Sequence, residues 1–449
     1  MSKKAITYLG LISIHIVLGF FTYLFSKLAI PYGLAILSIG ILTLLKTHNN
    51  NNQVLYICGY IIGSEVLLRM TGGFILYEIA KYSIIIFMLL SIYFSGFLKS
   101  SYLFWFFLIL LIPGILIASA NLNLDTSVRK AIAFNLSGPV CIGIASLYAC
   151  QRPITLKEIE NILLAILLPI ITTVTYMYFY TPSVRDLVKD TNSNFATSGG
   201  FGPNQVSTIL GLGIFILFAR LIFNSKDTKT KLVNLFLLFM VSYRGVITFS
   251  RGGVYTALIM IAFFTFILFR NVKRSSKIKI LLLTFFSCIA VAVIWFYSSF
   301  QTNGLIDKRY ANQDAAGRIK SSQLSGREMI MEDEFNLFLQ NPIMGIGVGK
   351  SKESRYDENG DPIASHNEIT RMLAEHGVFG VFALLILAIT PLALYINNKM
   401  HIYLLPFYFF WLLTINHAAM RLAAPAFVYA LTLLHVYGIE KSKKNDSTE

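Results

Sequence analysis

Charged residues are scarce in this chain. Only 14% of its 449 residues are Asp, Glu, Lys or Arg, whereas 55% are hydrophobic. Runs of about 20 apolar residues, the length at which a helix crosses a bilayer, recur throughout the sequence. This composition excludes an ordinary soluble protein and predicts an all-α polytopic integral membrane protein with about 12–14 transmembrane helices.

Cysteine is also rare. The four cysteines are Cys58, Cys141, Cys150 and Cys288. All of them fall in or at the edge of apolar runs, so we expect neither a disulfide framework nor a cysteine-based metal site. The acidic clusters at 332–334 and 357–358 lack a convincing metal-ligand spacing and are expected to be solvated. The glycine-rich stretch ends in Gly349-Lys350-Ser351 but is not a complete GxxxxGK(S/T) phosphate loop, because Met344 stands where its first glycine would be. The sequence predicts no bound metal and no cofactor.

Fourteen segments have the length and hydropathy of a membrane span. In the first half they are 5–25, 28–45, 53–70, 74–95, 101–120, 129–149 and 158–180. In the second half they are 204–224, 231–249, 252–270, 278–299, 370–396, 400–416 and 420–437. A polar stretch from Phe300 to His366 precedes the last three segments, and such a loop is where a membrane protein can handle a polar substrate.

The basic residues of the short loops all fall on one side of this count. By the positive-inside rule that side is the cytoplasm, which places both termini inside and the polar loop outside. The polar loop carries eight Lys/Arg against ten Asp/Glu, whereas the whole chain has a net charge of +15. The positive charge therefore indicates topology and not nucleic-acid binding.

This topology divides the chain into four parts. They are 1–299 (N-terminal transmembrane helices), 300–367 (large, partly helical external loop with the catalytic residues), 368–439 (C-terminal transmembrane helices) and 440–449 (cytoplasmic tail).

The motif SRGG at 250–253 lies between two apolar runs on the external side. Arg251 would project into the membrane boundary or a cavity beneath the loop. Arg244, seven residues earlier, would lie on the same helix face and about two turns deeper. Arginines inside a membrane usually face a cavity or a partner, so both are candidates for binding an anion. The alternative is a pair of snorkelling arginines beside a Gly-Gly helix break.

The motif SGRE at 325–328 starts a second candidate region. Its serine and glutamate form a capping box, which predicts a helix that begins here and stops before Pro342. Arg327 would then lie in the first turn, where free N–H groups and a guanidinium can bind an anion together. The alternative is that Arg327 pairs with Asp333 or Glu334.

The motif SHNE at 365–368 begins the helix that returns to the membrane. Its serine and glutamate form another capping box, which places His366 at the first helical position. Because a helix N-terminus disfavours the imidazolium, a neutral His366 could accept a proton from a hydroxyl. The six other histidines lie in or beside spans or on the cytoplasmic side, and we expect packing or incidental roles for them.

Other charges within apolar runs have simpler explanations. Three pairs are spaced to neutralise themselves along one helix face. They are Glu65 with Arg69, Glu78 with Lys81, and Arg371 with Glu375. Arg129, Lys130 and Arg421 lie at predicted external span ends and would add positive potential to an anionic site.

Arginines and one histidine at the outer membrane boundary suit an anionic, lipid-linked substrate. With these residues and its many spans, the chain resembles the O-antigen ligase/polymerase superfamily of bacterial envelope glycosyltransferases. The resemblance is strongest between Gly199 and Gly380. Its motifs are GPNQ at 202–205, SRGG at 250–253, GR at 326–327, NP and GIG within 341–347, and SHNE and EHG within 365–377. The chain departs from the family at 329–331, where methionines stand in place of a frequent aromatic residue.

The resemblance implies a metal-independent, inverting, GT-C-type transferase of the bacterial inner membrane that takes a glycan from undecaprenyl diphosphate at the periplasmic face. Carried over to this sequence, Arg251 and Arg327 would bind the diphosphate, and His366 would be the catalytic base. Additional candidates are Arg244, Arg129, Asn204, Asn367 and Glu375. The implied partners are the lipid-linked donor, a lipid A-core or other glycan acceptor, membrane lipids and a chain-length regulator protein.

Several functions are compatible with these residues. A ligase, a repeat-unit polymerase and a protein O-oligosaccharyltransferase would share the diphosphate site, and we expect a ligase. A lipid-linked oligosaccharide flippase should show two similar halves and short external loops, which this sequence lacks. A structural subunit would not depend on Arg251, Arg327 or His366.

Overall fold

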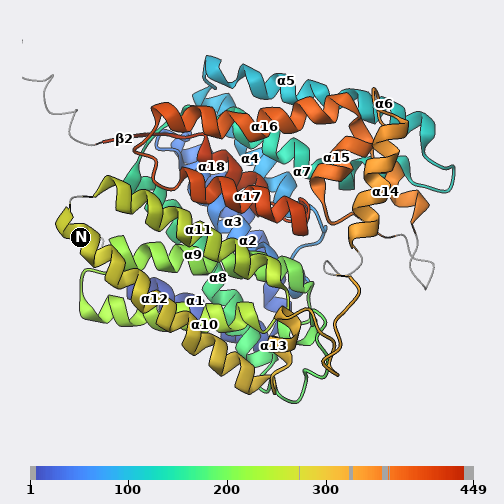
Figure 1. The fold of residues 1–449 in the computed structure, drawn as a ribbon. Helices are drawn as coiled ribbons and strands as arrows, with labels where there is room; N and C mark the ends of the chain where they lie inside the picture. Colours follow the sequence, from blue (N-terminus) through green and yellow to red (C-terminus); the bar gives the residue numbers. More distant parts are fainter. Residues whose placement is uncertain (1–6, 273, 323–326, 356–362, 364, 439–449) are drawn as a thin grey trace, which may run out of the picture.

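The computed structural model describes residues 7–272, 274–322, 327–355, 363 and 365–438. Helices form nearly all of its regular structure (Figure 1). The first nine α-helices are α1 (Tyr8–Leu24), α2 (Ala29–Thr47), α3 (Gln53–Met70), α4 (Ile79–Ser95), α5 (Tyr102–Leu110), α6 (Ile112–Asn121), α7 (Val128–Ala149), α8 (Leu156–Tyr180) and α9 (Pro203–Phe223). The others are α10 (Thr228–Val246), α11 (Arg251–Asn271), α12 (Arg274–Gln301), α13 (Leu305–Tyr310), α14 (Arg327–Gln340), α15 (Glu368–His376), α16 (Val378–Asn397), α17 (Leu404–His417) and α18 (Ala424–Thr432).

Short elements complete the fold. The 3₁₀ helices are η1 (Ser26–Leu28), η2 (Lys99–Ser101), η3 (Ala196–Ser198) and η4 (Lys350–Ser354). Two strands, β1 (Pro153–Thr155) and β2 (His435–Tyr437), pair in parallel with Ile154 opposite Val436. This pairing joins the end of the described chain to the loop between α7 and α8.

The predicted fold class is confirmed, because the described residues form a multi-pass membrane protein built of helices. Nine of its helical segments are long and apolar enough to cross a membrane, and α1, α4 and α17 are shorter apolar helices. The predicted span at 370–396 is divided into α15 and α16 at Gly377, which has φ +59°. A side chain at Gly377 would come within 2.6 Å of the Ile343 carbonyl oxygen, so glycine permits this close approach.

The prediction of a full-length helical span at 420–437 is wrong. The helix α18 has only nine residues, which at 1.5 Å per residue extend about 13 Å. Every residue of α18 is buried inside the protein, and the chain continues into β2. Because protein and not lipid surrounds this segment, a short helix with irregular ends is tolerated there.

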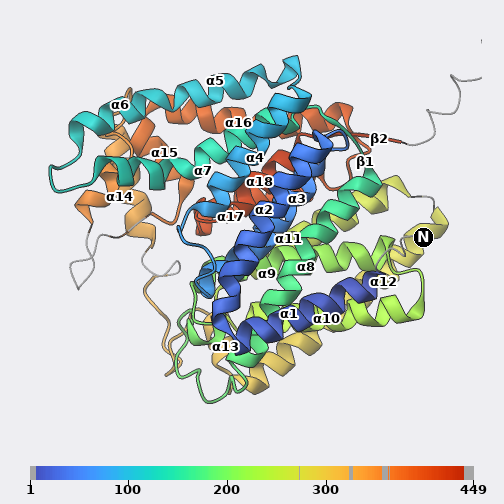
Figure 2. The ribbon, with the colours of Figure 1, turned by 180° about the vertical axis from the view of Figure 1, so that it is seen from behind.

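The centre of the bundle is α9, in which every residue from Gln205 to Arg220 is buried. It packs against α8, α10 and α11, and α17 packs on α11. The N-terminal helices α1 to α4 lie on the side of the molecule that faces away from the viewer in Figure 1, as the view from behind shows (Figure 2). The loops at the ends of these helices are thus attached to a bundle with a buried central helix.

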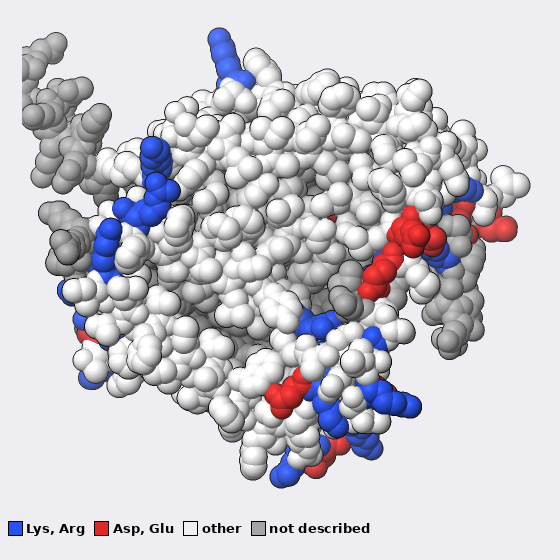
Figure 3. All heavy atoms as spheres, in the orientation of Figure 1, with Lys and Arg blue, Asp and Glu red and all other residues white. Residues whose placement is uncertain are grey.

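The two ends of the bundle differ in charge. Lys and Arg side chains predominate at the end where α1 begins and β2 lies, whereas both signs of charge gather at the other end (Figure 3). The helices α13, α14 and α15 lie at this second, mixed-charge end (Figure 1). We call it the outer end, following the positive-inside prediction.

Candidate functional site

A cavity of about 770 Å³ opens at the outer end of the bundle. Five stretches of chain supply its wall. They are the start of α9 with the loop before it, the first turns of α14, Arg355 at the end of η4, residues before the start of α15, and the segment after α17. Its polar side chains include Asn204, Gln205, Arg327, Asp333, His366 and Arg421. Residues more than 200 positions apart in the sequence therefore face one space.

Arg327 lies in the first turn of α14, as the sequence predicted. The predicted cap Ser325 lies outside the described residues. The Arg327 Nη1 atom donates a hydrogen bond to the His417 carbonyl (3.0 Å). Burial lowers the pKa of Arg327, and the positive charges of Arg421, Arg309 and Arg251 lower it further. A partly buried guanidinium among like charges is a favourable place for an anion.

Glu334, one of the alternative partners considered for Arg327, has a different role. Its side chain is fully buried and its Oε1 atom pairs with Arg355 Nη2 (3.0 Å). The Thr370 hydroxyl donates to its Oε2 atom (2.6 Å), and Ser365 Oγ lies 3.1 Å from the same atom. The expectation that the 332–334 cluster is solvated is therefore wrong at Glu334, which joins α14 to the start of α15.

His366 lies in the cavity wall, but its predicted position at the start of the helix is wrong. The N-cap is Asn367, whose Oδ1 atom accepts from the backbone N–H groups of Ile369 (2.8 Å) and Thr370 (3.3 Å). Asparagine is one of the strongest N-cap residues, and Ser365 Oγ instead accepts from the Asn367 N–H (3.2 Å). His366 thus precedes the cap and lines the cavity.

Arg251 begins α11, at the outer end of that helix. The residue before it is held by α9: Ser250 Oγ donates to Asn204 Oδ1 (2.8 Å), and Ser207 Oγ donates to the Ser250 carbonyl (2.8 Å). Asn204 therefore connects the Arg251 turn to the cavity wall. The charge of Arg251 helps to lower the pKa of both Arg309 and Arg327, so it acts electrostatically on the same region.

Two additional candidates lie elsewhere. Arg244 is not on one helix with Arg251, because α10 ends at Val246 before α11 begins. It is buried, its Nη2 atom donates to the Thr181 carbonyl (3.0 Å), and its guanidinium lies 3.9 Å from the centre of the Tyr178 ring. Arg129 is exposed in the first turn of α7.

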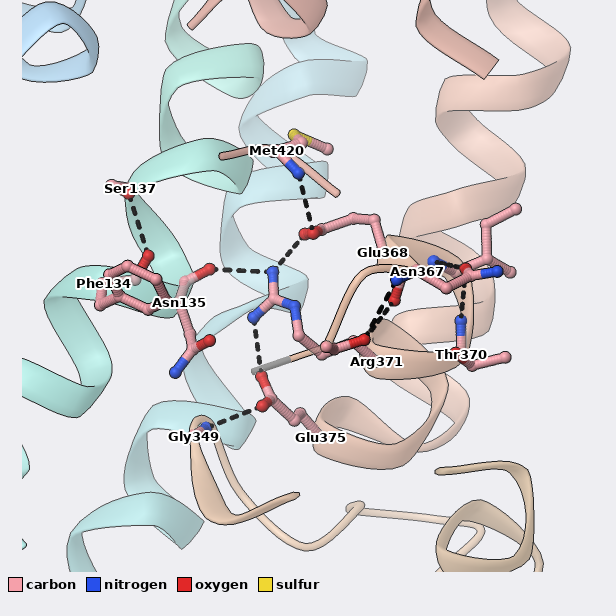
Figure 4. A network of polar contacts seen from close by, with 12 residues as sticks. Phe134, Asn135, Ser137, Gly349, Asn367, Glu368, Thr370, Arg371, Glu375 and Met420 are labelled. Carbon is pink, nitrogen blue, oxygen red and sulfur yellow. Dashed lines mark hydrogen bonds and ion pairs between the residues drawn. The ribbon is translucent and has the colours of Figure 1, made fainter. Parts of the chain in front are cut away.

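Glu375 and its neighbours form a buried network beside the cavity (Figure 4). Arg371 Nη1 pairs with Glu375 Oε2 (3.0 Å), and Arg371 also pairs with Glu368. The Gly349 N–H donates to Glu375 Oε1 (2.9 Å), and Arg371 Nη2 donates to the Asn135 carbonyl (3.0 Å). The predicted pairing of Arg371 with Glu375 is confirmed, and Glu375 holds the glycine-rich turn.

The other two predicted intramembrane pairs are also confirmed. Arg69 Nη2 lies 2.6 Å from Glu65 Oε1, and Lys81 pairs with Glu78. All four of these side chains are nearly inaccessible to solvent.

Sequence reasoning gave too little weight to Arg421 and Arg309. Arg421 was expected only to add potential at a span end, yet it lines the cavity beside His366. Arg309 was counted among the loop charges, yet it is buried and its Nε atom donates to the Phe249 carbonyl (3.0 Å). No local motif marks either residue, because each contact joins distant segments.

The described ranges contain scattered His, Cys, Asp and Glu side chains. Within them, no group of three or more His, Cys, Asp or Glu side chains could hold a metal ion.

Comparison with known proteins locates a family domain in this region. Residues 235–385 match the family model described as O-antigen ligase. The match confirms the resemblance to the O-antigen ligase/polymerase superfamily, and it includes Arg251, Arg327 and His366 but ends before Arg421. A search of curated proteins found no match.

Proposed function

Starting from the O-antigen ligase domain at residues 235–385, we propose that this multi-pass membrane protein is a glycosyltransferase. It moves a glycan from an undecaprenyl-diphosphate carrier to the hydroxyl of lipid A-core or another saccharide. The observation that carries the proposal is the outer-end cavity, where Arg327, Arg421 and His366 line one wall and the charge of Arg251 acts on it. The membrane is the bacterial inner membrane, with the cavity on the periplasmic side and both termini in the cytoplasm.

The proposed transfer reaction follows from the charged side chains of the cavity. Arg327 and Arg251 stabilise the negative charge that develops on the departing diphosphate, as preorganised cations do in phosphoryl and glycosyl transfer. His366 takes the proton of the acceptor hydroxyl, whose oxygen attacks the anomeric carbon from the face opposite the diphosphate. The sugar is therefore inverted, and neither a metal nor another cofactor is required.

A repeat-unit polymerase and a protein O-oligosaccharyltransferase are the alternatives within this reaction class. They would use the same donor site and differ only in the acceptor. A polymerase or ligase could also depend on a chain-length regulator protein. A lipid-linked oligosaccharide flippase is disfavoured, because the family match is to a transferase domain.

The test is glycan transfer by the purified protein from an undecaprenyl-diphosphate-linked donor, with lipid A-core, a second donor and a peptide offered as acceptors. We expect H366A to lose about 10²–10⁴-fold in rate while it still binds the donor, since this is the usual contribution of a general base. R327A should lose donor affinity. The matched control is R318A, because Arg318 is 81% exposed in a surface pair with Asp314. Full activity of H366A and R327A would reject the proposed site.

A further inference from the structure

The segment between α17 and α18, residues 418–423, is clamped by a buried ion pair on α3. The Arg69 Nη1 atom donates to the Arg421 carbonyl (3.0 Å), and Glu65 Oε2 accepts from the Ala423 N–H (2.8 Å). These two side chains also pair with each other. Charged groups are costly to bury unless they are well satisfied, so their use to fix this backbone indicates that its position matters.

The same segment is held from α15 as well. Glu368 Oε2 accepts from the Met420 N–H (3.3 Å), a contact visible in Figure 4. Ala419 has φ +50°, a left-handed conformation that is strained for a residue with a side chain. Its N–H donates to the His366 carbonyl (3.0 Å). Strain of this kind persists where surrounding contacts over-determine the backbone, as they do here.

The result of this clamping is to place the Arg421 guanidinium against His366. Its Nη2 atom donates to the Ser365 carbonyl (3.1 Å) and lies 3.5 Å from His366 Nδ1. An arginine can only donate hydrogen bonds, so Nδ1 must be the acceptor and the ring proton must be on Nε2. In this arrangement the Arg421 guanidinium lies against Nδ1, the imidazole nitrogen whose lone pair would accept a proton.

Arg421 also faces the second cation of the cavity. Arg327 is bonded to the carbonyl of His417, the residue directly before the clamped segment. After burial, the charge of Arg421 is the largest cause that lowers the pKa of Arg327. The two cations therefore repel each other across a common cavity, and a bound anion that contacts both would remove this repulsion.

We propose that Arg421 is a further diphosphate-binding residue, and that diphosphate binding draws its guanidinium away from His366 and frees Nδ1 to act as the base. This inference rests on the proposed function. In the reaction, the acceptor O–H bond breaks and its proton moves to Nδ1, while the acceptor oxygen bonds to the anomeric carbon. The bond from that carbon to the diphosphate oxygen breaks, and its electron pair leaves with the diphosphate held by Arg327 and Arg421.

The first experiment measures binding of geranyl diphosphate and of inorganic pyrophosphate to the purified full-length protein. The variants are R421M, R421K and the control R318M. We expect R421M to bind both probes about 10–100-fold more weakly, as expected for the loss of a charge-assisted hydrogen bond, and R421K to show a smaller loss. R318M should match the wild type. Weaker binding of geranyl diphosphate alone would assign the site to the lipid-linked form.

The second readout is the pH dependence of transfer. Removal of a cation beside Nδ1 favours protonation of the ring. The acid limb of the plot of transfer rate against pH should therefore move to higher pH in R421M, whereas in R421K it should stay close to that of the wild type. The other charged groups of the cavity wall are Arg327, Asp333 and Arg355, and all variants keep them.

Unchanged binding and an unchanged acid limb in R421M would overturn the inference while leaving the proposed function intact. If R421M fails to fold, R421K provides the test, because lysine lacks the two-pronged guanidinium. The inference would also be overturned if R421K had the melting temperature, the affinity for both probes and the activity of the wild type. Failure of the wild type to transfer any glycan would instead reject the proposed function.

Discussion

At the residue scale, the turn between α10 and α11 decides where Arg251 lies. Phe249 is buried in this turn with φ +58°, and Arg309 donates from Nε to its carbonyl oxygen (3.0 Å). Burial and the nearby charge of Arg251 both lower the pKa of Arg309. Arg309 therefore fixes the strained turn and adds positive charge behind Arg251.

Replacement of Arg309 tests this positioning role. We expect R309M to raise the KM for the lipid-linked donor about tenfold, because both a hydrogen bond to the turn and a positive charge are lost. R309K should retain part of the electrostatic effect and fall between R309M and the wild type. Steady-state kinetics with R318M as the reference would measure this, and a donor KM for R309M equal to that of R318M would contradict it.

At the scale of elements, the contact between α9 and α11 carries the Arg251 turn. The alternative of a Gly-Gly helix break is wrong, since Gly252 and Gly253 both lie inside the first turn of α11. A side chain at Gly253 would lie 2.0 Å from the Ser207 carbonyl oxygen on α9, and one at Gly252 would meet the His417 ring at 2.4 Å. These glycines allow three helices to approach closely at the cavity.

A pair of alanine substitutions separates the effect of this close contact on stability from the effect of helix propensity. G253A should destabilise the protein by about 1–3 kcal/mol, because α11 must move away from α9, and it should also reduce donor binding. G245A on α10 is the control, since its nearest new contact would be at 3.6 Å and alanine favours a helix by about 0.5–1 kcal/mol. Thermal unfolding in one detergent would compare them, and equal melting temperatures would refute the close-contact argument.

At the scale of the whole molecule, the charge asymmetry of the two ends predicts its orientation. Lys and Arg predominate at one end, while the cavity and the mixed charges lie at the other (Figure 3). From the positive-inside rule, we predict that the cavity end faces the periplasm. The orientation is essential to the proposed reaction, because the acceptor must reach His366 from that side.

Single cysteines introduced into a cysteine-free variant would test this orientation in intact cells. A cysteine replacing Arg318 should react with a membrane-impermeant maleimide from the periplasm, because Arg318 is exposed at the outer end. A cysteine replacing the exposed Lys399 should react only after the inner membrane is permeabilised. The reverse pattern would place the cavity in the cytoplasm and would rule out a periplasmic transferase.

Much of the fold was predictable because membrane hydropathy is a local signal. Twelve of the fourteen predicted segments contain a membrane-length or a shorter apolar helix, and a thirteenth contains the long but less apolar α10. The pairs of charges three or four residues apart are ion pairs as expected. The exception, α18, is surrounded by protein, so its length is set by packing and not by bilayer thickness. The cap at Asn367 was missed because two N-cap residues compete there, and only the contacts of Ser365 with Asn367 and Glu334 decide between them.

The sequence by itself determined that the protein is a multi-pass membrane protein and singled out candidate residues near 250, 327 and 366, because apolar runs and short motifs are properties of adjacent residues. Only the tertiary structure decided that Arg421 lies beside His366 and that Arg309 holds the Arg251 turn. It also showed that Arg244 donates to the Thr181 carbonyl and that Arg129 is exposed, and neither residue lines the cavity. These outcomes depend on contacts between residues about 55 to 350 positions apart, which only the packing of helices in space can establish.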